Sequence, residues 1–128
     1  MIKVYQKEGA MNVSEAAGTD MYLIDAPVAG TINVKECFGV LTEATGTMTA
    51  DGTVLLKVAG NTVGTITLTD DAAVGASFRF AVDGTYATDA NPYVEFAAGD
   101  DILVEIGTQA TGVATGDGDV FLGIDFGF

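Results

Sequence analysis

The chain has 128 residues and a net charge of −13, from 18 acidic and 5 basic side chains. One domain of this length buries enough surface to fold without disulfides or a metal, and so acidic a surface argues against nucleic acid or an anionic membrane as a direct partner. The chain has no histidine and one cysteine, Cys37, which excludes histidine-dependent catalytic triads, histidine metal sites and an intramolecular disulfide.

The N-terminal segment, residues 1–20, predicts a short strand at 2–6 followed by small and polar residues. Residues 1–8 alternate polar and apolar side chains and lack the apolar run of a signal peptide, and no stretch approaches 18 apolar residues. We therefore expect synthesis in a cytoplasm and no membrane association.

Two interpretations of this segment stay open. It is either an arm that adds a strand to the open sheet edge of another subunit or of a partner, or an edge strand of its own domain. The partner-binding residues under the first interpretation are Ile2, Lys3, Val4, Tyr5 and Lys7.

From residue 21 onward, apolar and polar side chains alternate with the period of two that is typical of strands. The clearest case is Val120, Leu122, Ile124 and Phe126 on one face of the last segment. We predict eight or nine strands, at residues 21–28, 31–41, 45–50, 53–59, 62–68, 76–82, 93–97, 101–107 and 119–127. Asp51-Gly52 and Gly60-Asn61 are the hairpin signals between them.

Alternation of this kind buries one face of each sheet, so two antiparallel sheets should pack face to face. The predicted fold is an all-β, jelly-roll-like β-sandwich over residues 21–128, with Phe80, Val104 and Leu122 in its core and residues 1–20 as an N-terminal strand or arm. An immunoglobulin-like sandwich is the alternative, although the chain lacks its tryptophan and its cysteine pair.

No motif for catalysis or for a cofactor stands out, and we predict that the protein is not an enzyme and holds no cofactor. Cys37 has no histidine to activate it and is expected to be a small buried apolar residue. Glu95 and Glu105 would be a candidate carboxylate pair only if their strands were neighbours.

Two loop features are candidates for binding. Asp117 and Asp119 flank a glycine and are candidate calcium ligands, although turn chemistry explains aspartate and glycine at such positions equally well. Residues 83–92 form a long loop between two strands, and Tyr86 and Tyr93 lie in it and beside it. That loop is either a binding loop or a variable surface excursion.

Three stretches of the sequence are rich in Gly, Thr, Ala and Val. They are residues 63–70 (VGTITLTD), 96–105 (FAAGDDILVE) and 116–125 (GDGDVFLGID). With the acidic, histidine-free composition, they make residues 20–128 resemble small virion proteins of tailed bacteriophages, in particular jelly-roll-like capsid decoration (cement) proteins.

The resemblance implies a structural protein on the outer surface of the virion. There it would bridge neighbouring major capsid proteins, as a homo-oligomer that is a trimer or a dimer. A head-fibre or tail component is an alternative within the same class. A carbohydrate-binding or adhesion module is the alternative from another class, because jelly rolls also host lectins and because Tyr86 and Tyr93 could stack on a sugar.

Overall fold

The computed structural model describes residues 2–5, 16–41, 51–68, 77–110 and 120–127. For the strand residues 2–5, 20–24, 40–41 and 120–127 it describes backbone pairing without side-chain packing. This part of the chain contains eleven strands, one short 3₁₀ turn and no α-helix. It therefore contains no helix that is long and apolar enough to cross a membrane.

The elements follow one another in a simple order along the chain. They are β1 (Ile2–Tyr5), β2 (Asp20–Asp25), β3 (Gly30–Asn33), η1 (Val34–Glu36), β4 (Phe38–Leu41), β5 (Gly52–Val58), β6 (Asn61–Leu68), β7 (Ser77–Arg79), β8 (Ala81–Val82), β9 (Tyr93–Phe96), β10 (Asp101–Thr108) and β11 (Val120–Gly127).

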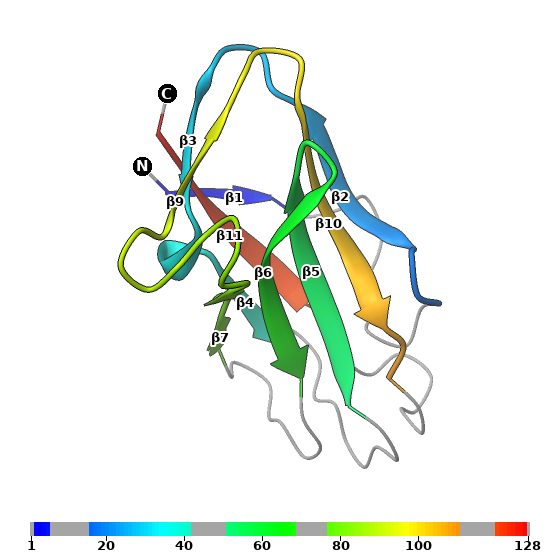
Figure 1. Cartoon of the computed structure of the whole chain (residues 1–128). Helices are drawn as coiled ribbons and strands as arrows, with labels where there is room; N and C mark the ends of the chain where they lie inside the picture. The colour runs from blue at the N-terminus through cyan, green and yellow to red at the C-terminus, as the bar shows by residue number, and fades with distance from the viewer. Residues whose placement is uncertain (1, 6–15, 42–50, 69–76, 111–119, 128) are drawn as a thin grey trace.

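The strands form two antiparallel sheets (Figure 1). The first sheet has the order β7-β4-β11-β3-β9, with β1 also paired to β11, and the second has the order β2-β10-β5-β6-β8. The prediction of an all-β chain built from antiparallel sheets is confirmed, and the arrangement is consistent with a β-sandwich.

The core follows from the alternation in the central strands. In β5, Val54, Leu56 and Val58 are buried and the residues between them are only partly covered. Val104 of β10 is paired with Leu56 and is also buried. Phe80 and Val104 are core residues as predicted, whereas the side chain of Leu122 lies outside the description.

The predicted strand at 31–41 is interrupted. Phe126 of β11 pairs with Ile32 and Gly123 pairs with Phe38, so the two residues of β11 between these pairs lie opposite five residues of its neighbour. The three extra residues form η1, a 3₁₀ turn between β3 and β4. Ile32 and Val34 keep the period-two alternation up to the start of η1. The alternation then breaks, because Lys35 and Glu36 are both exposed and Cys37 is buried.

The predicted strand at 76–82 is divided between the two sheets. β7 pairs with β4 in the first sheet and β8 pairs with β6 in the second. The chain changes sheet at Phe80, whose amide donates to the carbonyl of Cys37 at 3.0 Å and whose ring is buried. A large apolar side chain at this crossing fixes the edge where the two sheets meet.

Two further connections cross between the sheets side by side at the top of the view in Figure 1. One runs from β2 to β3 through Ala26, and the other runs from β9 to β10 through Gly99 and Asp100. Ala26 joins them, because its amide donates to the carbonyl of Asp100 at 2.9 Å and its carbonyl accepts from the amide of Gly99 at 2.7 Å. The antiparallel ribbon of β2 with β10 thus continues as β3 with β9.

β1 pairs with β11 of the same chain, with Ile2 opposite Asp125 and Tyr5 opposite Leu122. This is the edge-strand interpretation of residues 2–6, and one edge of β1 is consequently occupied within the domain. Lys7 and the predicted strand at 45–50 lie outside the described residues.

The hairpin between β5 and β6 turns one residue earlier than predicted. Ala59 and Gly60 both have positive φ, at 50° and 83°, as a two-residue type I′ turn requires. Gly52 is the first residue of β5 and pairs with Leu68, so the other strand of the predicted Asp51-Gly52 hairpin would fall in residues 42–50, which are not described.

Candidate functional site

The loop of residues 83–92 connects an edge of the second sheet to an edge of the first. At its start the amide of Asp83 donates to the carbonyl of Val63 at 3.1 Å, and at its end the carbonyl of Pro92 accepts from the amide of Val34 at 3.0 Å. The loop is therefore fixed to β6 and to η1. We call the loop, η1 and the adjoining Tyr93 the loop corner.

Asp83 organises the first half of the loop. Its carboxylate accepts hydrogen bonds from the amides of Thr85, Tyr86 and Ala87, at 3.1, 3.1 and 2.8 Å. Partial desolvation raises the pKa of Asp83, but the amides of Ala87, Tyr86 and Thr85 outweigh it, so the pKa lies below its ordinary value of 3.8. The side chain is thus ionised at neutral pH and holds one conformation of the loop.

Two backbone turns complete the loop. The amide of Gly84, at φ 90°, donates to the carbonyl of Ala87 at 2.8 Å, and Thr88 and Asn91 exchange amide–carbonyl hydrogen bonds of 3.0 and 3.1 Å. Ala87 is completely buried. The middle of the loop, at Ala87, therefore packs against the core, whereas the neighbouring Tyr86 remains exposed.

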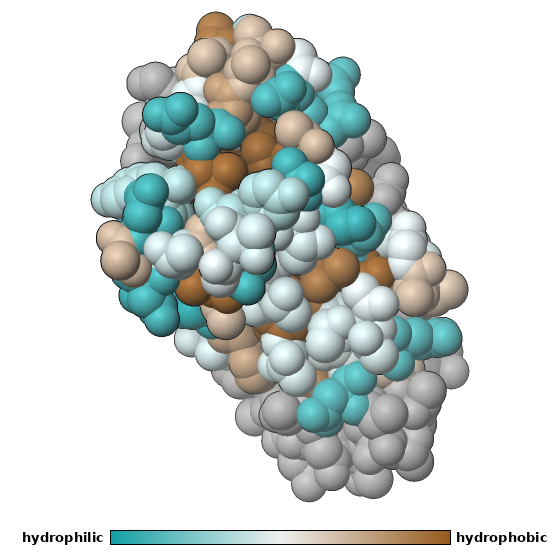
Figure 2. Space-filling model, viewed as in Figure 1, coloured by the Kyte–Doolittle hydropathy of each residue, from teal (hydrophilic) through white to brown (hydrophobic). Residues whose placement is uncertain are grey.

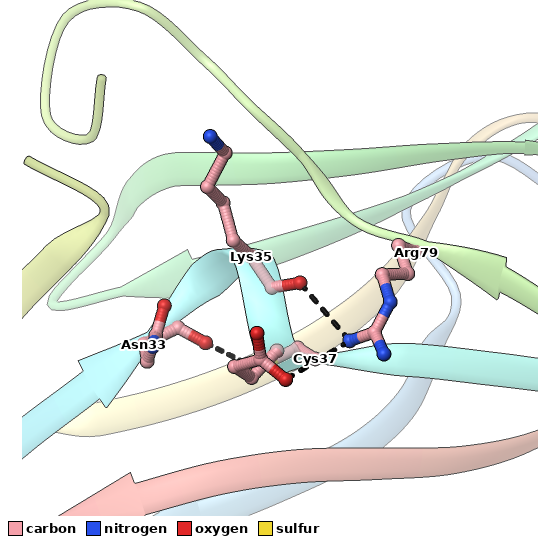
Figure 3. A network of polar contacts seen from close by, with 5 residues as sticks. Asn33, Lys35, Cys37 and Arg79 are labelled. Atoms are coloured by element: carbon pink, nitrogen blue, oxygen red, sulfur yellow. Dashed lines mark hydrogen bonds and ion pairs between the residues drawn. The ribbon is translucent and has the colours of Figure 1, made fainter. Parts of the chain in front are cut away.

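Ionic contacts join η1 to its surroundings, as Figure 3 shows around Arg79. Arg79 donates to the carbonyl of Lys35 at 3.3 Å and to the carboxylate of Glu36 at 3.2 Å, and Lys35 pairs with Asp89 of the loop at 3.1 Å. Two of the five basic side chains of the protein are thus placed at this corner, each beside an acid.

Cys37 follows η1 and is completely buried, with its thiol donating to the carbonyl of Asn33 at 3.3 Å (Figure 3). The prediction that Cys37 is a small buried apolar residue is confirmed.

Tyr86 and Tyr93 are the exposed aromatic residues of the loop corner. Their exposed fractions are 53% and 55%, and in the described part of the chain only Val28 is another large apolar residue with at least half of its surface exposed. An exposed tyrosine offers a ring for stacking and a hydroxyl for hydrogen bonding. Because the loop is already ordered, binding through Tyr86 costs little conformational entropy.

The carboxylate pair considered from the sequence does not form, and that hypothesis was wrong. Glu95 lies in β9 of the first sheet and Glu105 in β10 of the second. The short connection between these strands crosses between the sheets instead of closing a hairpin. Glu105 forms an ion pair with Lys57 of the neighbouring strand β5.

The calcium candidates Asp117 and Asp119 lie outside the described residues. Elsewhere, Asp100 has a turn role, because its carboxylate accepts from the amide of Ala97 at 2.9 Å. Asp101 lies opposite Asp25 across β2 and β10. Within the described ranges, no group of three or more acidic, histidine or cysteine side chains could hold a metal ion.

No protein-family model matches the chain, and a comparison with curated proteins finds no similar sequence.

Proposed function

We propose that the chain is a structural virion protein without catalytic activity, a capsid decoration protein that binds and bridges major capsid proteins on the outer shell. Two things support this proposal: the sequence resemblance over residues 20–128 and the all-β body that accompanies it. The finer part of the proposal is a jelly-roll-like topology. Its support is the antiparallel ribbon that bends from β2 and β10 in one sheet to β3 and β9 in the other.

The loop corner is the surface that we propose for binding the capsid. The single observation that carries this choice is the exposure of Tyr86 and Tyr93 around a loop that Asp83 holds in one conformation. Ordered loops bearing tyrosine bind protein surfaces with a small entropic cost. The charge of −13 favours a basic surface on the capsid as the docking area.

The test is mass spectrometry and cryo-electron microscopy of virions produced from the genome that encodes the chain. We expect the protein at many copies per particle, as density on the outer surface of the shell. Replacement of Tyr86 and Tyr93 by alanine should leave the melting temperature nearly unchanged and remove the protein from the particle. A chain that is absent from virions, or one found only in the tail or in a head fibre, would refute the decoration role.

Carbohydrate binding is the second candidate function, and the same exposed tyrosines favour it, because aromatic faces pack against sugar rings. A glycan array probed with the intact chain tests it. Reproducible binding that disappears in Tyr86→Ala and Tyr93→Ala would favour an adhesion module over the capsid. Binding that survives both substitutions would exclude the loop corner as a sugar site.

A further inference from the structure

The strand β9 lies at an edge of the first sheet. It pairs with β3 on one side, and among the described strands none pairs with its other side, which we call the outer edge of β9. Edge strands present backbone N–H and C=O groups that can accept a further strand. Hydrophilic and hydrophobic atoms lie side by side over β9 and the loop that leads into it (Figures 1 and 2).

The hydrogen bonding of Pro92 shows which residues of β9 direct their backbone groups to the outer edge. The amide of Val34 donates to the carbonyl of Pro92 at 3.0 Å, and the next pair of the register is Asn33 with Tyr93. In an antiparallel ladder, hydrogen-bonded pairs alternate with pairs whose backbone groups point away from each other. The amides and carbonyls of Tyr93 and Glu95 therefore point away from β3, to the outer edge.

The backbone groups just before and just after these two residues are already bonded within the chain. Asn91 exchanges amide–carbonyl hydrogen bonds with Thr88. The amide of Ala97 donates to the carboxylate of Asp100 at 2.9 Å, and its carbonyl accepts from the amide of Asp100 at 3.1 Å. Within the described part of the chain, no such bond is present at the outer edge itself. It therefore presents two donors and two acceptors, bounded at both ends.

The side chains at the outer edge define the partner. Tyr93 and Glu95 are both exposed, and the carboxylate of Glu95 forms no ion pair with any described residue. We propose that the outer edge of β9 binds an extended segment of another protein, which adds an antiparallel strand and carries a lysine or arginine opposite Glu95. An opposite-charge pair across two strands is stabilising. In the antiparallel direction, the residue two positions after the basic one lies opposite Tyr93, where an aromatic or aliphatic side chain fits.

Charge and strand length make this binding selective. The net charge of −13 attracts a basic segment and repels a second copy of this chain. β9 is four residues long and follows Pro92, and short edge strands that carry a charge or adjoin a proline resist pairing with unselected strands. The inference does not rest on the virion role, since it uses the backbone of β9 and the charge of Glu95 and not the rings of the loop corner.

Fluorescence anisotropy of a labelled synthetic peptide, mixed with the full chain, tests this inference. The probe is Ser-Thr-Val-Lys-Val-Phe-Thr-Ser with blocked ends, which places its lysine opposite Glu95 and its phenylalanine opposite Tyr93. We expect saturable binding with a dissociation constant below about 1 mM. Replacement of the lysine by glutamate should raise that constant at least about tenfold.

N-methylation of the peptide tests the hydrogen-bonding pattern. Methyl groups on the amides of the lysine and the phenylalanine remove the donors to the carbonyls of Glu95 and Tyr93, and should raise the dissociation constant at least about tenfold. A methyl group on the valine between them is the matched control and should change binding little, because that amide points away from β9. Equal effects of the two modifications would overturn the proposed pairing.

Charge reversal on the protein tests the selectivity. Glu95→Lys should weaken binding of the lysine peptide and strengthen binding of the glutamate peptide. Asp51→Lys makes the same change of charge at an exposed position beside β5 and is the control. Equal weakening by the two variants, or no binding of the lysine peptide up to about 1 mM, would overturn the proposal. The peptide series on the unmodified chain decides the matter if Glu95→Lys does not fold.

The outcomes separate this inference from the proposed function. A chain that binds the lysine peptide with this pattern and is absent from virions would refute the decoration role and leave the inference intact. A chain that decorates virions and does not bind the lysine peptide would refute the inference alone.

Discussion

Asp25 and Asp101 lie directly opposite each other across β2 and β10, so two carboxyl groups occupy one cross-strand pair. A hydrogen bond between the two carboxyls, and then the repulsion between them, raises the pKa of Asp101 above its ordinary value of 3.8. The folded protein thus holds a proton at Asp101 more readily than the unfolded chain. The contribution of Asp101 to stability is therefore fully present below pH 3.8 and is lost as the pH rises through the folded pKa.

Asp101→Asn should therefore have a higher melting temperature than the unmodified protein at about pH 7, and this advantage should vanish below the ordinary pKa. Thermal melts between about pH 3 and about pH 7 measure it. Asp51→Asn, which removes one exposed negative charge elsewhere, is the control and should gain less. An equal gain in the two variants would attribute the effect to net charge instead of the Asp25–Asp101 pair.

Asp83 has the opposite dependence on pH, because its pKa is lowered in the folded protein. Its contribution is present above pH 3.8 and is lost as the pH falls through the lower folded value. Asp83→Ala removes the acceptor for three amides and should cost about 1 kcal/mol at neutral pH, since the group is exposed to solvent. Denaturant unfolding measures this loss, and hydrogen exchange should increase at Tyr86 and Ala87.

Asp89→Ala is the comparison for Asp83→Ala, because it also removes an acid from the same loop. Asp89 contacts Lys35 through an exposed ion pair, and such pairs contribute about 0–1 kcal/mol. If both variants lost the same stability and the same amide protection, Asp83 would have no special role in holding the loop.

The alternation in the sequence was sufficient to predict most of the strands, because each sheet buries one face. It did not reveal the bulge at η1 or the change of sheet at Phe80. In both places inward side chains such as Ile32, Val34 and Phe80 stay buried while the backbone changes its pairing partner. That partner lies far away in the sequence, so a local pattern does not specify it.

The same dependence on contacts between distant segments explains which features of the loop corner the sequence did not reveal. The length of the loop at 83–92 and the tyrosines in it and beside it were visible in the sequence. The number of amides that Asp83 binds depends on the burial of Ala87, which is a tertiary property. The condition for a pair of Glu95 with Glu105, that their strands be neighbours, is not met. A short turn between two strands normally closes a hairpin, whereas this one crosses between sheets.

Gly64 is another position where packing between distant segments restricts the side chain. A Cβ atom there would lie 2.7 Å from Cγ1 of Val34 and 3.3 Å from the carbonyl oxygen of Ala81. Gly64→Ala should therefore destabilise the fold by about 1–3 kcal/mol, as overpacking does in well-filled cores. Chemical denaturation of the variant measures the loss.

A double-mutant cycle identifies the contact. Val34→Ala alone should also cost stability, because it leaves a cavity, but the loss in the double variant should be smaller than the sum of the two single losses. Strict additivity would mean that Gly64 and Val34 are not in contact.

The pairing of β1 with β11 changes the effect that removal of the N-terminus should have on the stability of the isolated domain. An arm that reached only to a partner would be dispensable for the stability of the isolated domain. Deletion of residues 1–5 instead removes the strand that pairs with Leu122–Asp125, and unpaired edge backbone is less stable. We expect a loss of about 2–4 kcal/mol, from a few hydrogen bonds of about 1 kcal/mol each. Circular dichroism melts measure this loss.

A synthetic peptide with the sequence of residues 1–6 should restore part of the lost stability when it is added to the truncated chain, because an extended peptide can complete an open sheet edge. A peptide of the same composition in scrambled order is the control, since it keeps the charge of Lys3 and loses the alternation of Ile2 and Val4. Among the described strands β1 pairs only with β11, and the hypothesis for Ile2, Lys3, Val4 and Tyr5 concerns the other edge of β1. If the truncated chain melted at the same temperature as the full chain, β1 would not stabilise the domain. The arm interpretation would then be favoured over the edge-strand interpretation.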